Sequence, residues 1–318
     1  MALKNFGIQR DGTQSPAATR LRAMLRSSTM VVAPFVLNAL HARIAEAVGF
    51  QAVYMTGFGT AAERGYPDVG LVTQTEMVEN ARYIASAVEV PVLCDADTGY
   101  GNPINVTRTI REYEAAGVAG CHLEDQVFPK KCGFFAGKQV VPLEEHVQKI
   151  RAALAARRDP DFVIIARTDA LAVHGWEEVI RRCQAYHKAG ADLVFVDGIT
   201  TVEDLHTYAS ALRDLPKLYS GMLLPVPEVE RMGFQAMITG GHHRGDLQSP
   251  HRGLPGVEGH GHALVQPPGD AGRHHQPAGA GPCLRAGASV RRLGGAAGER
   301  FGQPLVSRHQ AGEAPPLS

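Results

Sequence analysis

Short runs of apolar and β-branched residues alternate with longer segments of helical periodicity between about residue 17 and residue 241. A run of four to six such residues bounded by turn-forming residues is typical of a buried strand. Eight runs predict strands, at Met30–Pro34, Ala52–Thr56, Pro91–Asp95, Ala119–Glu124, Phe162–Arg167, Leu193–Asp197, Lys217–Ser220 and Gln235–Thr239. The segments between them predict amphipathic helices, so that strands and helices alternate along the chain.

Three of the helical segments have recognisable ends. Asn102-Pro103 is typical of a capped first turn, and Gly117 closes that segment. Pro142 begins a second helical pattern, and a third runs over about Trp176–Ala189 and ends at Gly190. Eight strand–helix units predict an α/β fold of the (β/α)8 type, a TIM barrel. A doubly wound open sheet is the alternative, but no GxGxxG motif follows the first predicted strand.

The composition changes after Gly241. The last 77 residues hold 15 of the 35 glycines, 9 of the 20 prolines and 8 of the 14 histidines, with eight arginines, no lysine and Phe301 as their only aromatic residue. A disordered tail, a His-rich metal-binding tract and out-of-frame translation of a GC-rich gene are all compatible with this composition, and we favour the last. The expected organisation is an N-terminal extension at 1–16, a catalytic (β/α)8 barrel at 17–241 and an irregular tail, disordered or frameshift-derived, at 242–318.

Charge and cysteine content narrow the class of protein. The 32 basic and 32 acidic residues cancel, so the chain shows no charge footprint for nucleic acid or an anionic membrane. Residues 1–11 lack the apolar core of a signal peptide, and no apolar run approaches the roughly 18 residues that a membrane span needs. Five cysteines without CxxC spacing are typical of a reducing compartment. A cytoplasmic protein without nucleic-acid or membrane partners is therefore expected.

Polar residues gather where the predicted strands end. Five pairs spaced two apart lie there, at Tyr54/Thr56, Asp95/Asp97, His122/Glu124, Arg167/Asp169 and Phe195/Asp197. A period of two places both members of a pair on one face of a strand, and the carboxyl ends of barrel strands carry the active site. Asp95 and Asp97, with Glu124 as third ligand, predict a Mg2+ site, while a helix cap and turn is the alternative. His122 and Tyr54 are either close to this metal or ordinary core residues.

The loop after the fourth predicted strand carries a different chemistry. In Lys130-Lys131-Cys132-Gly133 the lysines would lower the pKa of the thiol, and the glycines of this segment would let the loop close over a site. An exposed basic loop with an incidental cysteine is the alternative. Cys94, Cys121 and Cys183 lie inside predicted strands or helices and are expected to be core thiols.

Two further features would bind anions. Arg167 at a strand end would form a bidentate pair with a substrate carboxylate, or else a structural salt bridge with Asp169 or Glu124. The segment Thr56-Gly57-Phe58-Gly59 would present backbone N–H groups to a substrate oxygen, or else form a plain tight turn.

These residues resemble the isocitrate lyase/phosphoenolpyruvate mutase superfamily over roughly residues 20–240. The resemblance rests on YMTGFG from Tyr54, GYPDVG around Asp68, DADTGYGN from Asp95, HLEDQVFPKKCG from His122 and ARTDA from Ala166. It implies a (β/α)8 barrel, Mg2+ or alternatively Mn2+, small 2-oxo or 2-hydroxy acid substrates, and a homotetramer. The lysine–cysteine–glycine loop is similar to the methylisocitrate lyase-like branch.

The resemblance also implies residue roles. Asp95, Asp97 and Glu124 would bind the metal directly or through water. Cys132, Lys131 and Tyr54 would be catalytic, with Cys132 protonating the departing carbanion and Tyr54 handling the hydroxyl proton. The residues implied to contact substrate are Thr56, Gly57, Phe58, Asp68, His122, Lys130, Gly133, Arg167 and Asp197. The implied reaction is retro-aldol cleavage of a methylisocitrate- or alkylmalate-like 2-hydroxy di- or tricarboxylate to a 2-oxo acid and a second carboxylate.

Three departures from the lyase pattern leave the substrate open. Phe134 replaces the usual histidine, Asp197 stands where lyases tend to have glutamate, and the glycine-rich segment after the seventh strand is absent. Alternative functions are a phosphonomutase of the phosphoenolpyruvate or carboxyphosphonoenolpyruvate type, a phosphonopyruvate hydrolase, and an oxaloacetate hydrolase or decarboxylase. A further alternative is an inactive barrel that acts as a binding module.

Overall fold

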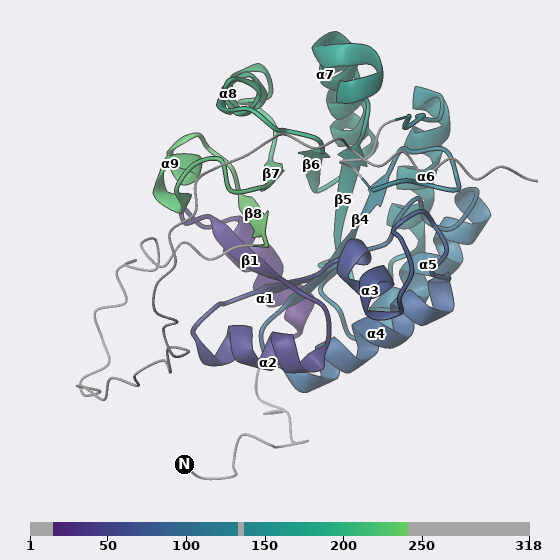
Figure 1. Ribbon diagram of the computed structural model, residues 1–318, viewed down its shortest axis with the longest axis vertical. Helices are drawn as coiled ribbons and strands as arrows, with labels where there is room; N and C mark the ends of the chain where they lie inside the picture. The colour runs from purple at the N-terminus through teal and green to yellow at the C-terminus, as the bar shows by residue number, and fades with distance from the viewer. Residues whose placement is uncertain (1–14, 133–136, 241–318) are drawn as a thin grey trace, which may run out of the picture. The chain divides into compact units, whose positions relative to one another are not determined.

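Eight parallel strands close into a barrel (Figure 1). The computed structural model describes residues 15–132 and 137–240. In barrel order the strands are β1 (Val31–Val36), β2 (Val53–Met55), β3 (Val92–Asp95), β4 (Gly120–Glu124), β5 (Val163–Thr168), β6 (Leu193–Val196), β7 (Lys217–Ser220) and β8 (Ala236–Thr239). Pairing of β8 with β1, with Val31 opposite Ala236, completes the ring. The (β/α)8 barrel predicted from the sequence is thereby confirmed, and the open doubly wound sheet is excluded.

Helices surround the barrel in the described part of the chain (Figure 1). They are α1 (Ala17–Leu25), α2 (Ala39–Ala47), α3 (Gly57–Glu63), α4 (Gln74–Ala87), α5 (Pro103–Ala115), α6 (Leu143–Ala156), α7 (Leu171–Ala189), α8 (Val202–Ala211) and α9 (Val226–Arg231). Each of the eight predicted strands is present within two residues of its expected bounds. The tail at 242–318, with the three interpretations given for it, lies outside the described residues.

The structure has the predicted helix ends at Asn102 and Gly190, and it adds one helical turn before the predicted start of α7. Asn102 caps α5 by accepting hydrogen bonds from the backbone N–H groups of Ile104 and Asn105. Gly190 ends α7 in the left-handed conformation expected of a helix C-cap. A turn at 171–174 precedes the predicted start of this helix, and Gly175, with φ of 76°, separates the two.

The segment at 56–59 is neither an open nest nor a plain turn, because it begins α3. Thr56 is the N-cap, and its hydroxyl accepts a hydrogen bond from the Gly59 N–H. A Cβ atom at Gly57 would lie 2.5 Å from Asp95 Oδ2, so only glycine fits where this helix meets β3.

Two apolar layers hold the barrel together. Inward-facing side chains of the strands form a central cluster, and Ala18 and Leu21 of α1 join it at the amino ends of the strands. Outward-facing strand residues pack against the helices in two further clusters. The expected core thiols Cys94, Cys121 and Cys183 are fully buried in these outer clusters. The amino end is thus sealed by α1, which leaves the carboxyl ends of the strands for polar residues.

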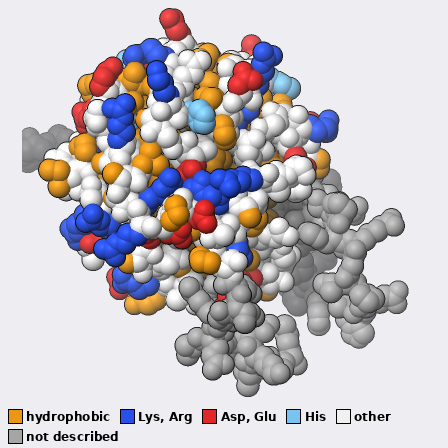
Figure 2. Space-filling model, turned by 180° about the vertical axis from the view of Figure 1, so that it is seen from behind, with side chains coloured by type: hydrophobic (Ala, Val, Ile, Leu, Met, Phe, Trp, Pro, Cys, Tyr) orange, Lys and Arg blue, Asp and Glu red, His pale blue; other side chains and the backbone are white. Residues whose placement is uncertain are grey.

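Within residues 15–132 and 137–240, no helix is both long and apolar enough to cross a membrane. On the face opposite to that of Figure 1, basic and acidic side chains lie beside one another rather than in separate patches (Figure 2).

Candidate active site at the carboxyl ends of the strands

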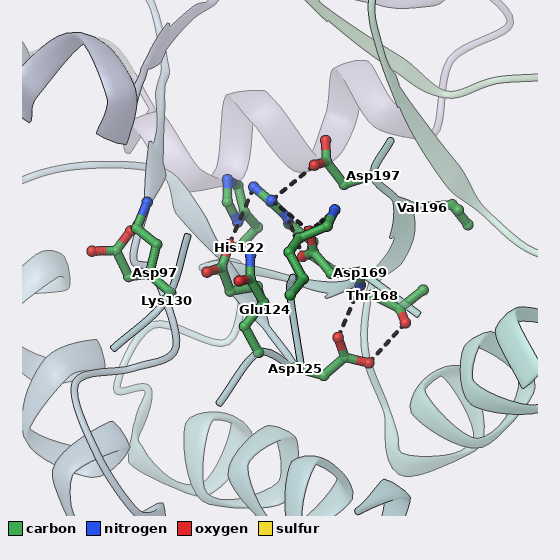
Figure 3. Close-up of polar contacts among 12 residues, drawn as sticks. Asp97, His122, Glu124, Asp125, Lys130, Thr168, Asp169, Val196 and Asp197 are labelled. Carbon is green, nitrogen blue, oxygen red and sulfur yellow. Dashed lines mark hydrogen bonds and ion pairs between the residues drawn. The ribbon is translucent and has the colours of Figure 1, made fainter. Parts of the chain in front are cut away.

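Buried polar side chains meet where the strands end (Figure 3). The Tyr54 hydroxyl lies 2.6 Å from His122 Nε2, and the two rings are stacked. His122 Nε2 also lies 3.6 Å from Asp95 Oδ1, and its ring meets the edge of Phe195. Burial lowers the pKa of His122 to about 4, so the imidazole is neutral near pH 7. Burial raises the pKa of Tyr54 well above its ordinary value, and the phenol therefore keeps its proton.

The two aspartates of the DADTGYGN segment stand in different environments. Asp95 Oδ2 accepts a hydrogen bond from the Gly57 N–H, and Oδ1 accepts one from the Asp97 N–H. Burial opposes the charge of Asp95, but His122, Lys130 and Arg167 together hold its pKa at about 2. Burial raises the pKa of Asp97 to about 6 against the opposing effect of Lys130. One carboxylate is thus fixed as an anion, and its neighbour is close to titration.

The backbone of this segment is held in an uncommon conformation. Asp97 has φ of 45° and Tyr100 has φ of 60°, both in the left-handed region. The Asp97 carbonyl accepts the N–H of Glu124, and the Thr98 carbonyl accepts a hydrogen bond from the buried Lys149. Such strain costs on the order of 1–3 kcal/mol and clusters at functional sites, where surrounding contacts maintain it.

Lys130 connects two acidic residues that are distant in the sequence. Its ammonium lies 2.5 Å from Asp68 Oδ1 and 2.9 Å from Asp97 Oδ1. Burial works against the charge of Lys130, but Asp97, Glu124 and the other nearby carboxylates raise its pKa well above the ordinary value. Lys130 therefore remains a cation and holds the Asp68 segment against the end of β3.

Arg167 contacts three buried carboxylates. Nε and Nη2 donate to the two oxygens of Asp169 at 2.9 and 3.1 Å, and Nη2 also donates to Asp197 at 2.9 Å. Nη1 lies 3.2 Å from Glu124 Oε2. The salt bridges with Asp169 and Glu124, expected as the alternative to substrate binding, are therefore formed. The hydrogen bonds use the donors on Nε and Nη2, whereas the contact of Nη1 with Glu124 is an ion pair without hydrogen-bond geometry.

The remaining predicted residues lie at the edge of this network. Cys132 is half-buried, and its backbone N–H donates to the Asp68 carbonyl at 2.9 Å. The Lys131 ammonium donates to the Gly137 carbonyl at 2.9 Å rather than to a carboxylate. Phe58 is exposed on α3. Gly133, and with it Phe134, lies outside the described residues.

The sequence did not indicate Lys138, which is buried in the network. Its ammonium donates to Asp169 Oδ1 at 2.9 Å. Asp169 is thus held between Lys138 and Arg167, which lower its pKa although burial opposes this. No strand-end spacing marks Lys138, because it follows the loop that leads away from β4.

The donor set fits a hard divalent cation. The Glu124 carboxylate is fully buried, and neither of its oxygens accepts a hydrogen bond from the described residues. Burial raises its pKa well above the ordinary value. As they stand, the side chains at 15–132 and 137–240 do not form a group of three that could hold a metal. Mg2+ typically takes one or two carboxylates together with water and substrate oxygens, and Asp95, Asp97 and Glu124 supply such donors.

The fold and the site together define a class of protein, a (β/α)8 barrel with buried acid, base and cation groups at the catalytic end. The family model described as phosphoenolpyruvate phosphomutase matches residues 21–247. The chain belongs to this family, within the isocitrate lyase/phosphoenolpyruvate mutase superfamily. The resemblance seen in the sequence motifs is confirmed, and so is the expected class of enzyme, a carbon–carbon lyase of this superfamily.

Two curated relatives, both named as lyases, match about 70% of this chain. A 2,3-dimethylmalate lyase of Eubacterium barkeri is 45% identical over 227 residues, which are 70% of this chain and 78% of the relative. A probable 2-methylisocitrate lyase of Corynebacterium glutamicum is 43% identical, over 69% of this chain and 73% of the relative. The crystal structure of a 2,3-dimethylmalate lyase has a TM-score of 0.68 and 43% identity, over 71% of this chain and 79% of that chain.

Two other solved structures are named for hydrolases. An oxaloacetate acetylhydrolase in complex with 3,3-difluorooxalacetate has a TM-score of 0.68 and 41% identity, over 71% of this chain and 81% of that chain. A phosphonopyruvate hydrolase in complex with oxalate and Mg2+ has a TM-score of 0.65 and 34% identity, over 71% and 81% of the two chains. The family therefore includes lyases and hydrolases of similar fold.

Proposed function

We propose that the protein is a Mg2+-dependent lyase that cleaves a methylisocitrate- or alkylmalate-like 2-hydroxy di- or tricarboxylate. The products would be a 2-oxo acid and a second carboxylate. The observation that carries the proposal is the buried arrangement of Arg167 among Glu124, Asp169 and Asp197, beside the Tyr54–His122 pair. Arg167 would be the cation that binds a substrate carboxylate, and the Tyr54–His122 pair would be the proton path beside it. The similarity to lyases of dimethylmalate and methylisocitrate supports the substrate class.

Arg167 would bind a substrate carboxylate by exchanging one of its partners. Asp169 accepts two hydrogen bonds from the Arg167 guanidinium, whereas Asp197 and Glu124 each have a single contact with Arg167. Burial raises the pKa of Asp197, so this carboxyl is the more easily protonated and released of the two aspartates. Thr56, Gly57, Phe58, Asp68, Lys130 and Gly133 remain further proposed substrate contacts.

Asp95, Asp97 and Glu124 would hold Mg2+, partly through water. Bound there, the ion would polarise the carbonyl group that develops during cleavage. Mn2+ has the same preference for oxygen donors and is the expected substitute.

Tyr54 and His122 would take up the proton of the substrate hydroxyl. As the C–C bond breaks, this proton would pass to the Tyr54 oxygen while the Tyr54 proton passes to His122 Nε2, 2.6 Å away. Such a relay keeps Tyr54 neutral, as its raised pKa requires. It generates an imidazolium 3.6 Å from the Asp95 carboxylate, and the lowered pKa of His122 would make this group release the proton readily once the bond has broken.

Cys132 would complete the reaction by protonating the carbanion that leaves with the bond electrons, and Lys131 would support its loop. The Asp68 carbonyl, which accepts the Cys132 N–H, ties this thiol to the segment that Lys130 holds at the site. His122 would then release the proton that it took up and the thiolate would recover one, by exchange through solvent, so that both groups return to their starting state.

Hydrolysis of oxaloacetate or phosphonopyruvate is the second candidate function. The similarity to an oxaloacetate acetylhydrolase, at 41% identity, favours it. A mutase is less favoured, because the mutases typically carry asparagine near the position of Cys132. The protein is further proposed to be a homotetramer, and light scattering on the purified protein would test this oligomeric state. A cytoplasmic location is proposed as well.

One experiment separates these functions. The protein is incubated in the presence of Mg2+ and, separately, of EDTA. The substrates offered are isocitrate, 2-methylisocitrate, alkylmalates, oxaloacetate and phosphonopyruvate. Proton and phosphorus NMR identify the products. Metal-dependent formation of glyoxylate or pyruvate with a matching second acid is the expected result. Formation of oxalate with acetate, or of inorganic phosphate with pyruvate, would instead show that the protein is a hydrolase. Turnover that survives EDTA would exclude the metal-dependent mechanism.

A further inference from the structure

Asp125, which follows the proposed metal ligand Glu124, is fully buried and accepts hydrogen bonds from the end of β5 and from α7. Its Oδ1 accepts the backbone N–H of Asp169 at 2.9 Å (Figure 3). Its Oδ2 accepts the Thr168 hydroxyl at 2.7 Å, Arg182 Nη1 at 2.9 Å and the Tyr186 hydroxyl at 2.8 Å. One carboxylate thus fastens the end of β4 to the end of β5 and to α7.

The contact with Asp169 leads directly to Arg167. The Asp169 backbone is fixed by Asp125, and its side chain forms the two-point contact with the guanidinium of Arg167. Lys138 holds the same carboxylate from its other side. The Asp125 side chain forms no hydrogen bond or ion pair with Arg167, and Asp169 is the residue that is hydrogen-bonded to both of them.

We propose that Asp125 is a positioning residue that sets the orientation of Arg167 through Asp169. The part of this inference that concerns substrate affinity rests on the proposed function, in which Arg167 binds a substrate carboxylate. The orientation of the guanidinium itself does not depend on that function.

Asparagine cannot replace Asp125 in this arrangement. The Thr168 and Tyr186 hydroxyls can rotate their hydrogens away, but the N–H of Asp169 and the Nη1–H of Arg182 have fixed directions. They point at different oxygens of the carboxylate. Either orientation of an amide therefore turns its NH2 group toward one of these donors, and the Asp169 backbone or α7 must shift.

Asp192 provides a matched control at the opposite end of the barrel. It also accepts a backbone N–H, from Ile164 at 2.9 Å, and arginine donors, from Arg157 at 3.1 Å and Arg22 at 2.8 Å. It precedes β6 and none of its hydrogen bonds reaches the network of Arg167. Asp192→Asn should therefore destabilise the fold in a similar way without affecting the site.

The first test reads Arg167 directly. Protein labelled with 15N-arginine gives side-chain Nε–H signals, and the signal absent from Arg167→Lys is that of Arg167. We expect this signal to shift, or to broaden through faster exchange with water, in Asp125→Asn and to stay unchanged in Asp192→Asn. An unchanged signal in Asp125→Asn would overturn the proposal, as would the same change in both variants, because that would show a general loss of stability.

The second test uses the substrate identified in the panel. Asp125→Asn should raise KM about tenfold, the effect of about one charge-assisted hydrogen bond, with a smaller change in kcat, while Asp192→Asn stays within about twofold of the wild type. A shifted Arg167 signal with unchanged KM would retain the positioning role and refute substrate binding by Arg167. Combined with Arg167→Lys, Asp125→Asn should cost less than about twofold in KM, since its effect passes through Arg167.

Discussion

Replacement of His146 by leucine should remove part of the acid sensitivity of the fold. His146 lies on α6, is fully buried, and packs edge-on against Tyr186 with ring centroids 4.7 Å apart. Burial, followed by the charges of Lys149 and Arg182, lowers its pKa from 6.5 to about 3. Leucine has a similar volume and cannot bind a proton, so the exchange removes the titration with little change in packing.

The direction follows from proton binding in the two states. Above about pH 6.5 the ring is neutral in both the folded and the unfolded chain, so His146 adds no pH dependence there. Between pH 6.5 and about 3 the unfolded chain binds one more proton, and the free energy of unfolding falls as the pH falls. From pH 7 to pH 5 this loss amounts to about 2 kcal/mol. His122, with its pKa of about 4, adds a loss of the same sign, which is present in both proteins and cancels in the comparison.

Urea unfolding at pH 7 and pH 5, followed by circular dichroism, measures the difference. The wild type should lose about 2 kcal/mol more than His146→Leu between the two pH values. His206→Leu, on the exposed side of α8, is the control and should lose as much as the wild type, because its ring stays in water on folding. Equal losses for His146→Leu and the wild type would refute the reasoning.

Three further changes test the site. Gly57→Ala should weaken Mg2+ binding about tenfold or more in calorimetry, because the added Cβ would lie 2.5 Å from Asp95 Oδ2 and displace that carboxylate. Glu124→Gln should abolish the rise in melting temperature that Mg2+ produces in the wild type, and a full rise in the variant would exclude Glu124 as a ligand. Cys132→Ser should lower kcat about 100-fold or more while Mg2+ binding, measured in parallel, stays normal, and near-normal kcat would remove Cys132 from the mechanism.

The barrel could be predicted because its strands are marked by continuous apolar runs. Both faces of each strand are covered, by the central cluster and by the helices, so the runs are easily recognised. Helix α3 was not predicted, because Gly57 and Gly59 lower helix propensity in its first turn. Its Thr56 cap and the close approach of Gly57 to Asp95 depend on the tertiary structure.

The strand-end residues of the site could be predicted for a similar reason. The pleat brings Tyr54, Asp95, His122 and Arg167 to one end of the barrel, as the spacing of two indicates. The residues that hold them could not be found in this way. Arg182 reaches Asp125 across 57 positions of sequence, and no local pattern connects them. The sequence also left open whether Arg167 is paired within the protein, which only the three surrounding carboxylates reveal.

Two aspartates, the fully buried Asp125 and the half-buried Asp192, make similar contacts at opposite ends of one barrel. Each accepts a backbone N–H of the β5 region and a hydrogen bond from an arginine on a surrounding helix, Arg182 of α7 or Arg22 of α1. Only Asp125 adjoins the proposed active site, so we expect that the other end of the barrel can be altered independently of catalysis. Engineering for heat resistance should therefore begin around Asp192 and α1, where improved packing or charge pairing leaves turnover untouched. Selection for new substrates would act at the Asp125 end. Stabilising changes at the α1 end would compensate for the stability that such substitutions cost.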